Sequence, residues 1–244
     1  MKVWIFWLVP VLLAAANQDP LERLFDGKLP ATQRANACFE LRGKADPEIV
    51  AALSRALEDP AVLSCAAENL RIASAVDPLK KAMSSEDFQI RAAAARELGS
   101  FQKTELLDLL SQAAQDPNAL VATNALAGLS QYQDSGVNPY LAALARKGGM
   151  IGDMALERLW QHDSKLALTV ARGLLSSSQV PDQLYAMRII GASGDSSDIA
   201  QLKEVADAHK ETLAQHDRGF GFMPAINLSR AAQSAISAIQ ARLK

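Results

Sequence analysis

The residue types that most often bind metal ions are sparse in this chain. The histidines are His162, His209 and His216. His209 and His216 lie seven residues apart, two turns along one face of a predicted helix, whereas paired metal ligands on a helix usually lie one turn apart. His162 stands at a predicted helix end, where a cationic side chain interacts favourably with the helix dipole. With no third ligand nearby in the sequence, we predict no metal site.

Motifs for covalent catalysis and for phosphate binding are also missing from the sequence. No serine stands in a Gly-x-Ser-x-Gly turn, no glycine-rich loop precedes a Lys-Ser or Lys-Thr pair, and no Cys-x-x-Cys-His motif could attach a haem. Adjacent carboxylates such as Glu58-Asp59 and Glu86-Asp87 stand at predicted helix starts, where aspartate caps free N–H groups. We therefore predict a non-catalytic protein without a bound cofactor.

Composition and charge narrow the class of protein further. The 244 residues are 49% hydrophobic and only 5% aromatic, with 13 glycines and 10 prolines, which favours helix over sheet. The formal net charge is −2, and acidic and basic residues alternate without a Lys/Arg run. Because a protein that neutralises several phosphates needs a basic stripe, we expect no nucleic-acid partner.

The N-terminus has the three parts of a secretory signal peptide. Lys2 supplies the positive charge, residues 3–13 the apolar run, and residues 14–16 a small-residue cleavage site. The apolar run is shorter than the roughly 20 residues that a membrane-spanning helix needs; an uncleaved anchor is the alternative. We expect removal of residues 1–16, a periplasmic or extracellular protein, and no stable membrane span after cleavage.

Cys38 and Cys65 are the two cysteines of the chain. An even number of cysteines in an exported protein favours a disulfide. The alternative is a pair of buried thiols, since free cysteine packs as a small hydrophobic side chain. Two cysteines are too few for a structural zinc site.

The chain contains an internal repeat, and its most regular copy is residues 91–99 (RAAAARELG). Aligning the copies on a leucine gives intervals of 29, 28 and 28 residues, followed by less regular intervals of 33 and 31 residues. These anchor residues are Leu41, Leu70, Leu98, Leu126, Leu159 and Ile190. Repeats at such a period indicate stacked units that bury a continuous core.

Helix-start signals recur with the same period as the anchors. Asp59, Asp87 and Asp116 are predicted to cap the helix that carries the next anchor. Residues that precede a proline are predicted to open the other helix of each repeat: Asp46, Asp77 and Asn138. Each repeat is therefore expected to contain two helices, and the small Ala92 and Ala95 should let neighbouring second helices approach closely.

The pattern resembles HEAT repeats, specifically the short HEAT-like repeats first described in phycobilin lyases. The matching residues are Asp87, Arg91, Ala92, Ala94, Ala95, Leu98 and Gly99. The resemblance implies an all-α, armadillo-like, right-handed solenoid of about six two-helix repeats over residues 30–244, with residues 17–29 as a lead-in. Residues 193–244 match loosely and are expected to form an atypical capping repeat, with helices over about 198–215 and 225–243.

The resemblance also suggests where a partner protein could bind. In this family the second helices line the concave face, so the polar residues near each anchor are candidate contacts: Glu68, Arg96, Glu97, Glu157, Arg158 and Arg188. Their alternative role is a solvated surface of mixed charge. Phe220 and Phe222, in a glycine-rich segment, are either an exposed hydrophobic anchor or a seal for the end of the core.

We therefore predict a non-catalytic scaffold or adaptor in the cell envelope that binds another protein or peptide. HEAT-like hydroxylases that act on a modified lysine bind iron through His-Glu pairs, and here no His is followed by Glu. One alternative is an enzyme subunit resembling phycobilin lyases, although those enzymes work in the cytoplasm. The other is a binder of a small apolar ligand near residues 216–224.

Overall fold

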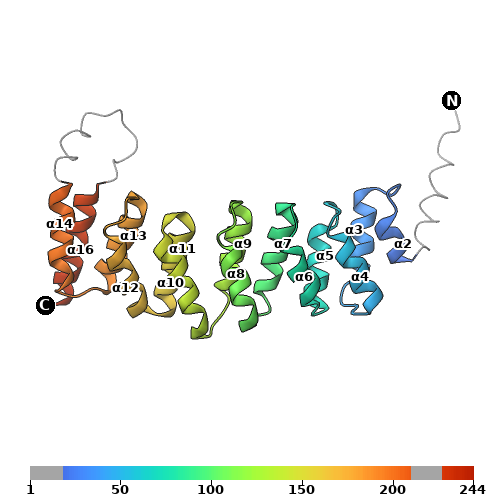
Figure 1. Cartoon of the computed structure of the whole chain (residues 1–244), viewed down its shortest axis with the longest axis horizontal. Coiled ribbons are helices and arrows are strands. Elements are labelled where there is room, and N and C mark those ends of the chain that lie inside the picture. The colour runs from blue at the N-terminus through green and yellow to red at the C-terminus, as the bar shows by residue number, and fades with distance from the viewer. Residues whose placement is uncertain (1–18, 210–226) are drawn as a thin grey trace, which may run out of the picture. The chain divides into compact units, whose positions relative to one another are not determined.

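The computed structural model describes residues 19–209 and 227–244. The predicted signal peptide, His216, Phe220 and Phe222 lie outside these ranges. The described residues form helices joined by turns, with no strand among them, and they divide into two compact units after Gln131 (Figure 1). We call residues 19–131 unit 1, and residues 132–209 and 227–244 unit 2. The all-α prediction is confirmed, and no described helix is long and apolar enough to cross a membrane.

Unit 1 is a row of helix pairs. In chain order its elements are α2 (Pro20–Phe25), α3 (Ala31–Glu40), α4 (Pro47–Ala56), α5 (Leu63–Ile72), α6 (Val76–Ala82), α7 (Phe88–Gly99), the 3-10 helix η1 (Thr104–Leu106), α8 (Leu107–Ala113) and α9 (Ala119–Leu129). The second helices of the pairs, which we call B helices, are α3, α5, α7 and α9. Each B helix packs against the next one in this order.

Unit 2 repeats the same arrangement. Its elements are the 3-10 helix η2 (Ser135–Val137), α10 (Asn138–Lys147), α11 (Gly149–His162), α12 (Ser164–Leu174), α13 (Val180–Ser193), α14 (Asp198–Ala208) and α16 (Leu228–Arg242). The B helices are α11, α13 and α16, and α13 packs against both of the others.

The predicted anchor residues form the core of the helix pairs. Leu41, Leu70, Leu98, Leu126, Leu159 and Ile190 are all at most 2% exposed. Ala92 and Ala95 are buried beside them, as expected for helices that approach closely. The spacing of the anchors therefore identified the buried side of α5, α7, α9, α11 and α13.

The helix boundaries differ from the sequence prediction near the C-terminus. Helix α14 ends at Ala208, earlier than residue 215, and α16 begins at Leu228. His209 stands just beyond the end of α14, so the two-turn helical spacing predicted for His209 and His216 is wrong at His209.

Only some of the predicted caps act as caps. Asp87 is the N-cap of α7 and accepts a hydrogen bond from a backbone N–H of the first turn at 2.7 Å. Asp46 occupies the N-cap position of α4, but its side chain makes no capping hydrogen bond. Asp77 and Asn138 lie inside the first turns of α6 and α10, so for them the prediction is wrong. Two further residues predicted as caps, Asp59 and Asp116, lie before the N-cap residues of α5 and α9.

These aspartates instead bind arginines of earlier helices. Three arginines each make two hydrogen bonds to an aspartate 25 or 26 residues further along: Arg34 to Asp59, Arg91 to Asp116 and Arg172 to Asp198. In the central pair, Nε and Nη2 of Arg91 lie 2.8 and 3.1 Å from the carboxylate of Asp116. The hydrogen bond from Arg91 lowers the pKa of Asp116 below its ordinary value of 3.8. The first two pairs tie a helix to the turn that precedes a helix of the next repeat, and the third ties α12 to the first residue of α14.

Candidate protein-binding site

The candidate contact residues of unit 1 belong to one network of ion pairs across three B helices. On α7, the side chain of Glu97 is only 8% exposed. Its Oε2 accepts a hydrogen bond from Arg71 Nε of α5 at 2.8 Å, and its Oε1 accepts one from Arg96 Nε at 2.9 Å. A buried carboxylate is costly unless it is paired, and here two arginines pair it. Glu97 is therefore the buried centre of the network, and little of its surface is left for a partner to contact.

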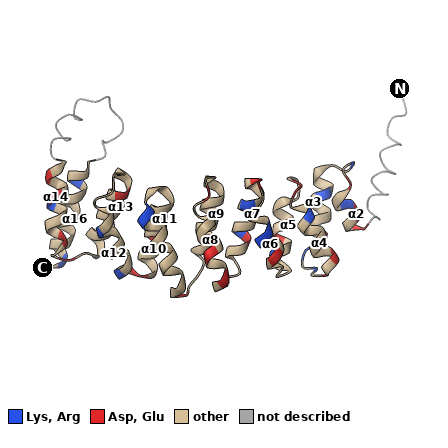
Figure 2. Cartoon of the chain, viewed as in Figure 1, with Lys and Arg blue, Asp and Glu red and all other residues tan. Residues whose placement is uncertain are grey.

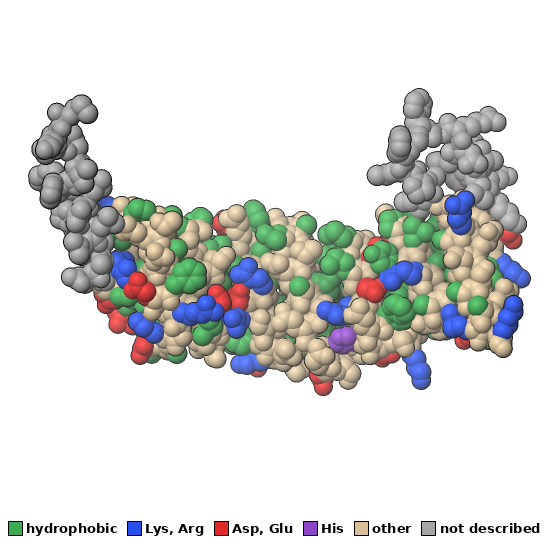
Figure 3. Space-filling view, turned by 180° about the vertical axis from the view of Figure 1, so that it is seen from behind, with side chains coloured by type: hydrophobic (Ala, Val, Ile, Leu, Met, Phe, Trp, Pro, Cys, Tyr) green, Lys and Arg blue, Asp and Glu red, His purple; other side chains and the backbone are tan. Residues whose placement is uncertain are grey.

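The network continues from Glu68 on α5 to the end of α3. Glu68 Oε1 accepts a hydrogen bond from Arg42 at 2.7 Å and lies 3.8 Å from Arg71 Nη2. The face shown in Figure 3 likewise has basic and acidic side chains interleaved with hydrophobic ones, and Figure 2 shows both signs of charge spread along the helices. The mixed-charge surface expected from the sequence is therefore present, and ion pairs connect its charged side chains from one repeat to the next.

An open hollow of about 460 Å³ lies on the surface of these B helices, and we call it the unit 1 hollow. It is lined by Phe39, Ser64, Cys65, Glu68, Arg71, Arg96, Glu97, Ser100 and Gln131. The residue Phe39 is 53% exposed, and half of the Arg96 side chain is exposed. Sequence reasoning selected Glu68, Arg96 and Glu97 but missed Phe39 and Arg71. The only signal in the sequence was a phenylalanine, Phe39, directly after Cys38 on a predicted helix.

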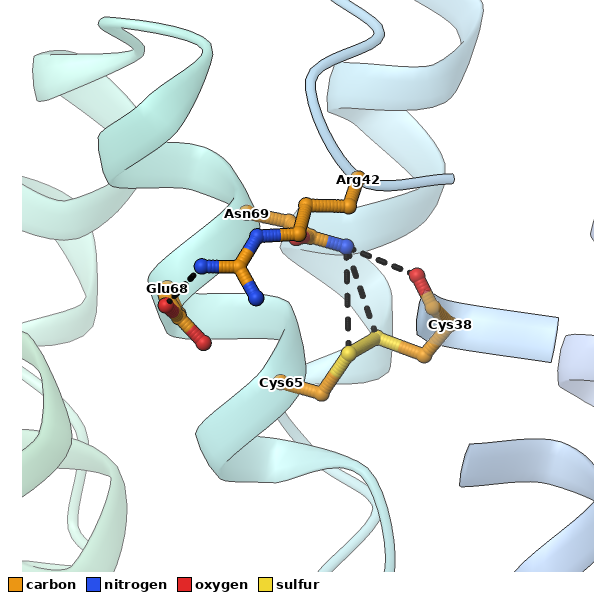
Figure 4. Close-up of a disulfide and its surroundings, with 5 residues drawn as sticks. All are labelled: Cys38, Arg42, Cys65, Glu68 and Asn69. Carbon is orange, nitrogen blue, oxygen red and sulfur yellow. Dashed lines mark hydrogen bonds and ion pairs between the residues drawn. A yellow bond between two sulfur atoms is a disulfide. The ribbon is translucent and has the colours of Figure 1, made fainter. Parts of the chain in front are cut away.

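A disulfide joins Cys38 of α3 to Cys65 of α5 beside this hollow (Figure 4). The two Cα atoms are 6.3 Å apart, and both residues are buried. The buried amide of Asn69 donates a hydrogen bond to the Cys38 carbonyl oxygen at 2.8 Å. The disulfide and this hydrogen bond fix the first two B helices of unit 1 against each other.

The candidate contact residues of unit 2 lie on α11 and α13. Glu157 of α11 forms an ion pair with Arg188 of α13. The guanidinium carbon of Arg188 also lies 5.7 Å from the ring centre of Trp160 and 5.3 Å from that of Tyr185. Arg158 instead donates a hydrogen bond to Gln161 on its own helix at 2.8 Å. The structure therefore brings Glu157 and Arg188 together and leaves Arg158 outside this cluster.

Large hydrophobic side chains are exposed on the same two helices. Met150 is 58%, Met154 44% and Tyr185 36% exposed. Trp160 is held in place by a 2.7 Å hydrogen bond from its Nε1 to the Ser193 hydroxyl. We call Met150, Met154, Glu157, Trp160, Tyr185 and Arg188 the α11/α13 surface. Its aromatic residues were missed in the sequence, where no motif connects Trp160 with Tyr185.

A buried pair of carboxylates lies between the same helices. Asp153 is 5% and Asp182 2% exposed. Asp182 accepts hydrogen bonds from the Gly149 N–H at 2.8 Å and from the Ser177 hydroxyl at 2.6 Å, whereas one oxygen of Asp153 has no hydrogen-bond partner. Burial, and secondarily the charge of Asp182, raise the pKa of Asp153 to about 6.

In the described ranges, no group of three or more His, Cys, Asp or Glu side chains is placed to hold a metal ion.

Comparison with known proteins supports the repeat family. Residues 76–149 match the family model for HEAT repeats. Residues 76–149 therefore contain HEAT repeats, and the resemblance predicted from residues 91–99 is confirmed for this stretch. No curated protein has a significant match to the sequence.

Two solved structures are similar to the chain at low identity. One is human deoxyhypusine hydroxylase in complex with glycerol, with 17% identity, a TM-score of 0.39, and coverage of 96% of this chain and 99% of that one. The other is an engineered protein, with 18% identity, a TM-score of 0.34, and coverage of 91% and 95%. Similarity at this level carries no information about the function of this chain.

Proposed function

We propose that this protein is a non-catalytic scaffold that binds another protein in the cell envelope. The observation that carries the proposal is the α11/α13 surface of unit 2. Tyr, Trp, Met and Arg are residue types enriched at protein interfaces. The few residues that dominate the binding energy are most often Trp, Tyr and Arg. Here all four types are gathered on two adjacent helices, with Met150, Met154 and Tyr185 exposed.

The surface is also organised before any partner arrives. The ion pair with Glu157 and the stacking on Trp160 and Tyr185 restrict the long Arg188 side chain. A restricted side chain loses less conformational entropy on binding, which favours affinity.

The envelope location rests on the sequence of residues 1–16 and on the disulfide, because disulfides persist in oxidising compartments. N-terminal sequencing of the protein from its native host tests it. We expect the mature chain to begin at Asn17. A chain that retains residues 1–16 and is found in the cytoplasm would contradict export.

Protein binding is tested by crosslinking and affinity capture from envelope extracts with the full mature chain. We expect a specific partner that is lost with Tyr185→Ala and with Arg188→Ala. The control is Lys165→Ala, because Lys165 is exposed on α12, away from the α11/α13 surface. Capture that does not differ between the wild type and the Tyr185 and Arg188 variants would argue against the proposal.

A second candidate function, binding of a small apolar ligand, is favoured by a groove of about 400 Å³ between α13 and α16. Leu184, Met187, Ala231 and Ala235 contribute apolar lining. Titration with an apolar fluorescent dye tests this function. We expect saturable binding that is lost with Ala235→Glu, and unsaturable fluorescence would argue against it.

A further inference from the structure

The two arginines of the unit 1 hollow have hydrogen-bonding capacity to spare. Glu97 engages both of them through Nε. Within the described ranges, Nη1 and Nη2 of Arg96 donate to no other group, and Arg71 Nη2 reaches Glu68 only at 3.8 Å. The Nη1–Nη2 edge of a guanidinium group matches a carboxylate through two parallel hydrogen bonds. The hollow is therefore lined by donors suited to a carboxylate.

The positions of these donors are set by the protein itself. The Glu97 side chain is buried and accepts from two different helices, so it orients Arg71 and Arg96 together. Ordering a mobile arginine side chain on binding costs conformational entropy. This loss is smaller here, because a buried carboxylate already restricts each arginine through its Nε. This arrangement favours recognition of a carboxylate at a fixed place.

The balance of charge points to an anion carrying a single charge. The network contains three arginines and two glutamates, an excess of one positive charge, in a chain with a formal net charge of −2. Glu68 and Glu97 line the hollow among the arginines, and such carboxylates repel a polyanion. One carboxylate is compensated by the excess positive charge, whereas each further negative charge would meet that repulsion uncompensated.

An apolar contact lies beside the donors. Phe39 lines the same hollow and is 53% exposed. It directly follows Cys38, whose disulfide to Cys65 ties α3 to the helix that carries Arg71. The hollow of about 460 Å³ falls within the range of roughly 300–1,000 Å³ typical of ligand sites. A carboxylate with a neighbouring apolar side chain fits these features.

We propose that the unit 1 hollow binds an extended peptide segment of a partner protein that carries a single carboxylate, with this carboxylate on Arg71 and Arg96 and an adjacent apolar side chain on Phe39. This inference rests on the proposed function, since it names the chemistry of one partner segment. It is independent of the α11/α13 surface, which lies in unit 2.

The test uses the mature full-length protein and a dye-labelled peptide, acetyl-Gly-Ser-Phe-Glu-Phe-Ser-amide. A matched peptide has glutamine in place of glutamate, and a third carries its only carboxylate at the C-terminus. Fluorescence polarisation up to millimolar concentration measures affinity. We expect the glutamate peptide to bind at least about tenfold more tightly than the glutamine peptide, because charge-assisted hydrogen bonds are the stronger ones. The third peptide distinguishes a side-chain carboxylate from a chain terminus.

Variants assign the binding to the hollow. Arg96→Gln and Phe39→Ala should each weaken the glutamate peptide by about tenfold, and circular dichroism checks that both variants remain folded. The control is Lys80→Gln, at an exposed position on α6 that belongs neither to the charge network nor to the lining of the hollow; it should bind like the wild type. Equal affinity for the glutamate and glutamine peptides, no binding of either, or unchanged affinity in Arg96→Gln would overturn the inference. Partner capture that still depends on Tyr185 would leave the proposed function standing in that case.

Discussion

Gly99 of α7 and Gly128 of α9 meet backbone to backbone: a Cβ atom built on Gly128 would lie 2.9 Å from the Cα of Gly99. Real Cβ atoms essentially never come this close to another backbone atom. The two B helices can therefore pack at this distance only because neither position carries a side chain.

Gly128→Ala should consequently destabilise unit 1 despite the better helix propensity of alanine. Overpacking of this kind costs about 1–3 kcal/mol, which urea denaturation would measure. Gly173→Ala is the control, since Gly173 is exposed on α12 with nothing within 4 Å of an added Cβ; it should gain up to about 1 kcal/mol. Equal effects of the two substitutions would contradict the close approach of α7 and α9.

Arg91→Ala should also destabilise the chain, because it removes the two hydrogen bonds that Arg91 donates to the Asp116 carboxylate and leaves only the one from the Asn118 N–H. The expected loss in the free energy of unfolding is about 2 kcal/mol. Since the pKa of Asp116 is lowered in the folded state, this stability is present above pH 3.8 and is lost as the pH falls below that value. Arg42→Ala, which removes a more exposed ion pair, should cost less than about 1 kcal/mol.

The raised pKa of Asp153 predicts the opposite pH dependence in unit 2. Its pKa rises from 3.8 to about 6 on folding, so the protonated form is favoured in the folded state. Stability from this group is present below pH 3.8 and is lost as the pH rises through about 6. Asp153→Asn should therefore stabilise the protein on the order of 1 kcal/mol at neutral pH, as measured by denaturation at several pH values. The control is Asp108→Asn, at an exposed position on α8, which should leave the pH profile of the wild type unchanged. An unchanged pH profile in Asp153→Asn would contradict the raised pKa of Asp153.

The disulfide predicts resistance to alkylation and a measurable stabilising effect. Mass measurement of the mature protein, alkylated without prior reduction, should find no label on Cys38 or Cys65; two labels would contradict the disulfide. Replacing both residues with alanine opens a link between positions 27 residues apart, and such a change should cost about 3 kcal/mol. Thermal unfolding with and without reductant provides the comparison, with the double variant expected to show no effect of reductant.

The repeat could be read from the sequence because burial repeats with it. Leu98 and the equivalent anchors recur at near-constant spacing, and each is buried. The partners of charged residues could not be read in this way. Asp116 looked like a helix cap, yet it binds Arg91, which lies 25 residues earlier. Such pairing depends on the distance between stacked helices, which local sequence patterns do not encode.

The candidate contact residues show the same limit. Arg96 and Glu97 are neighbours in sequence, but one side chain is half exposed and the other is buried between two arginines. A polar pair beside an anchor leucine marks the edge of the buried face, and a small rotation of the helix decides which member is covered. Tyr185 and Trp160, on different helices, both lie beside the guanidinium group of Arg188.

The position of the disulfide affects how unit 1 comes apart. Repeat arrays hold only neighbour-to-neighbour contacts, so fraying ordinarily begins at a terminal repeat. In unit 1 the covalent link joins the first two B helices, near the N-terminal end. Peeling of α3 away from α5 is thereby blocked while the link is oxidised. Reduction would open this route and expose the segment between α3 and α5 to proteases, so the disulfide protects this end of the unit from local unfolding.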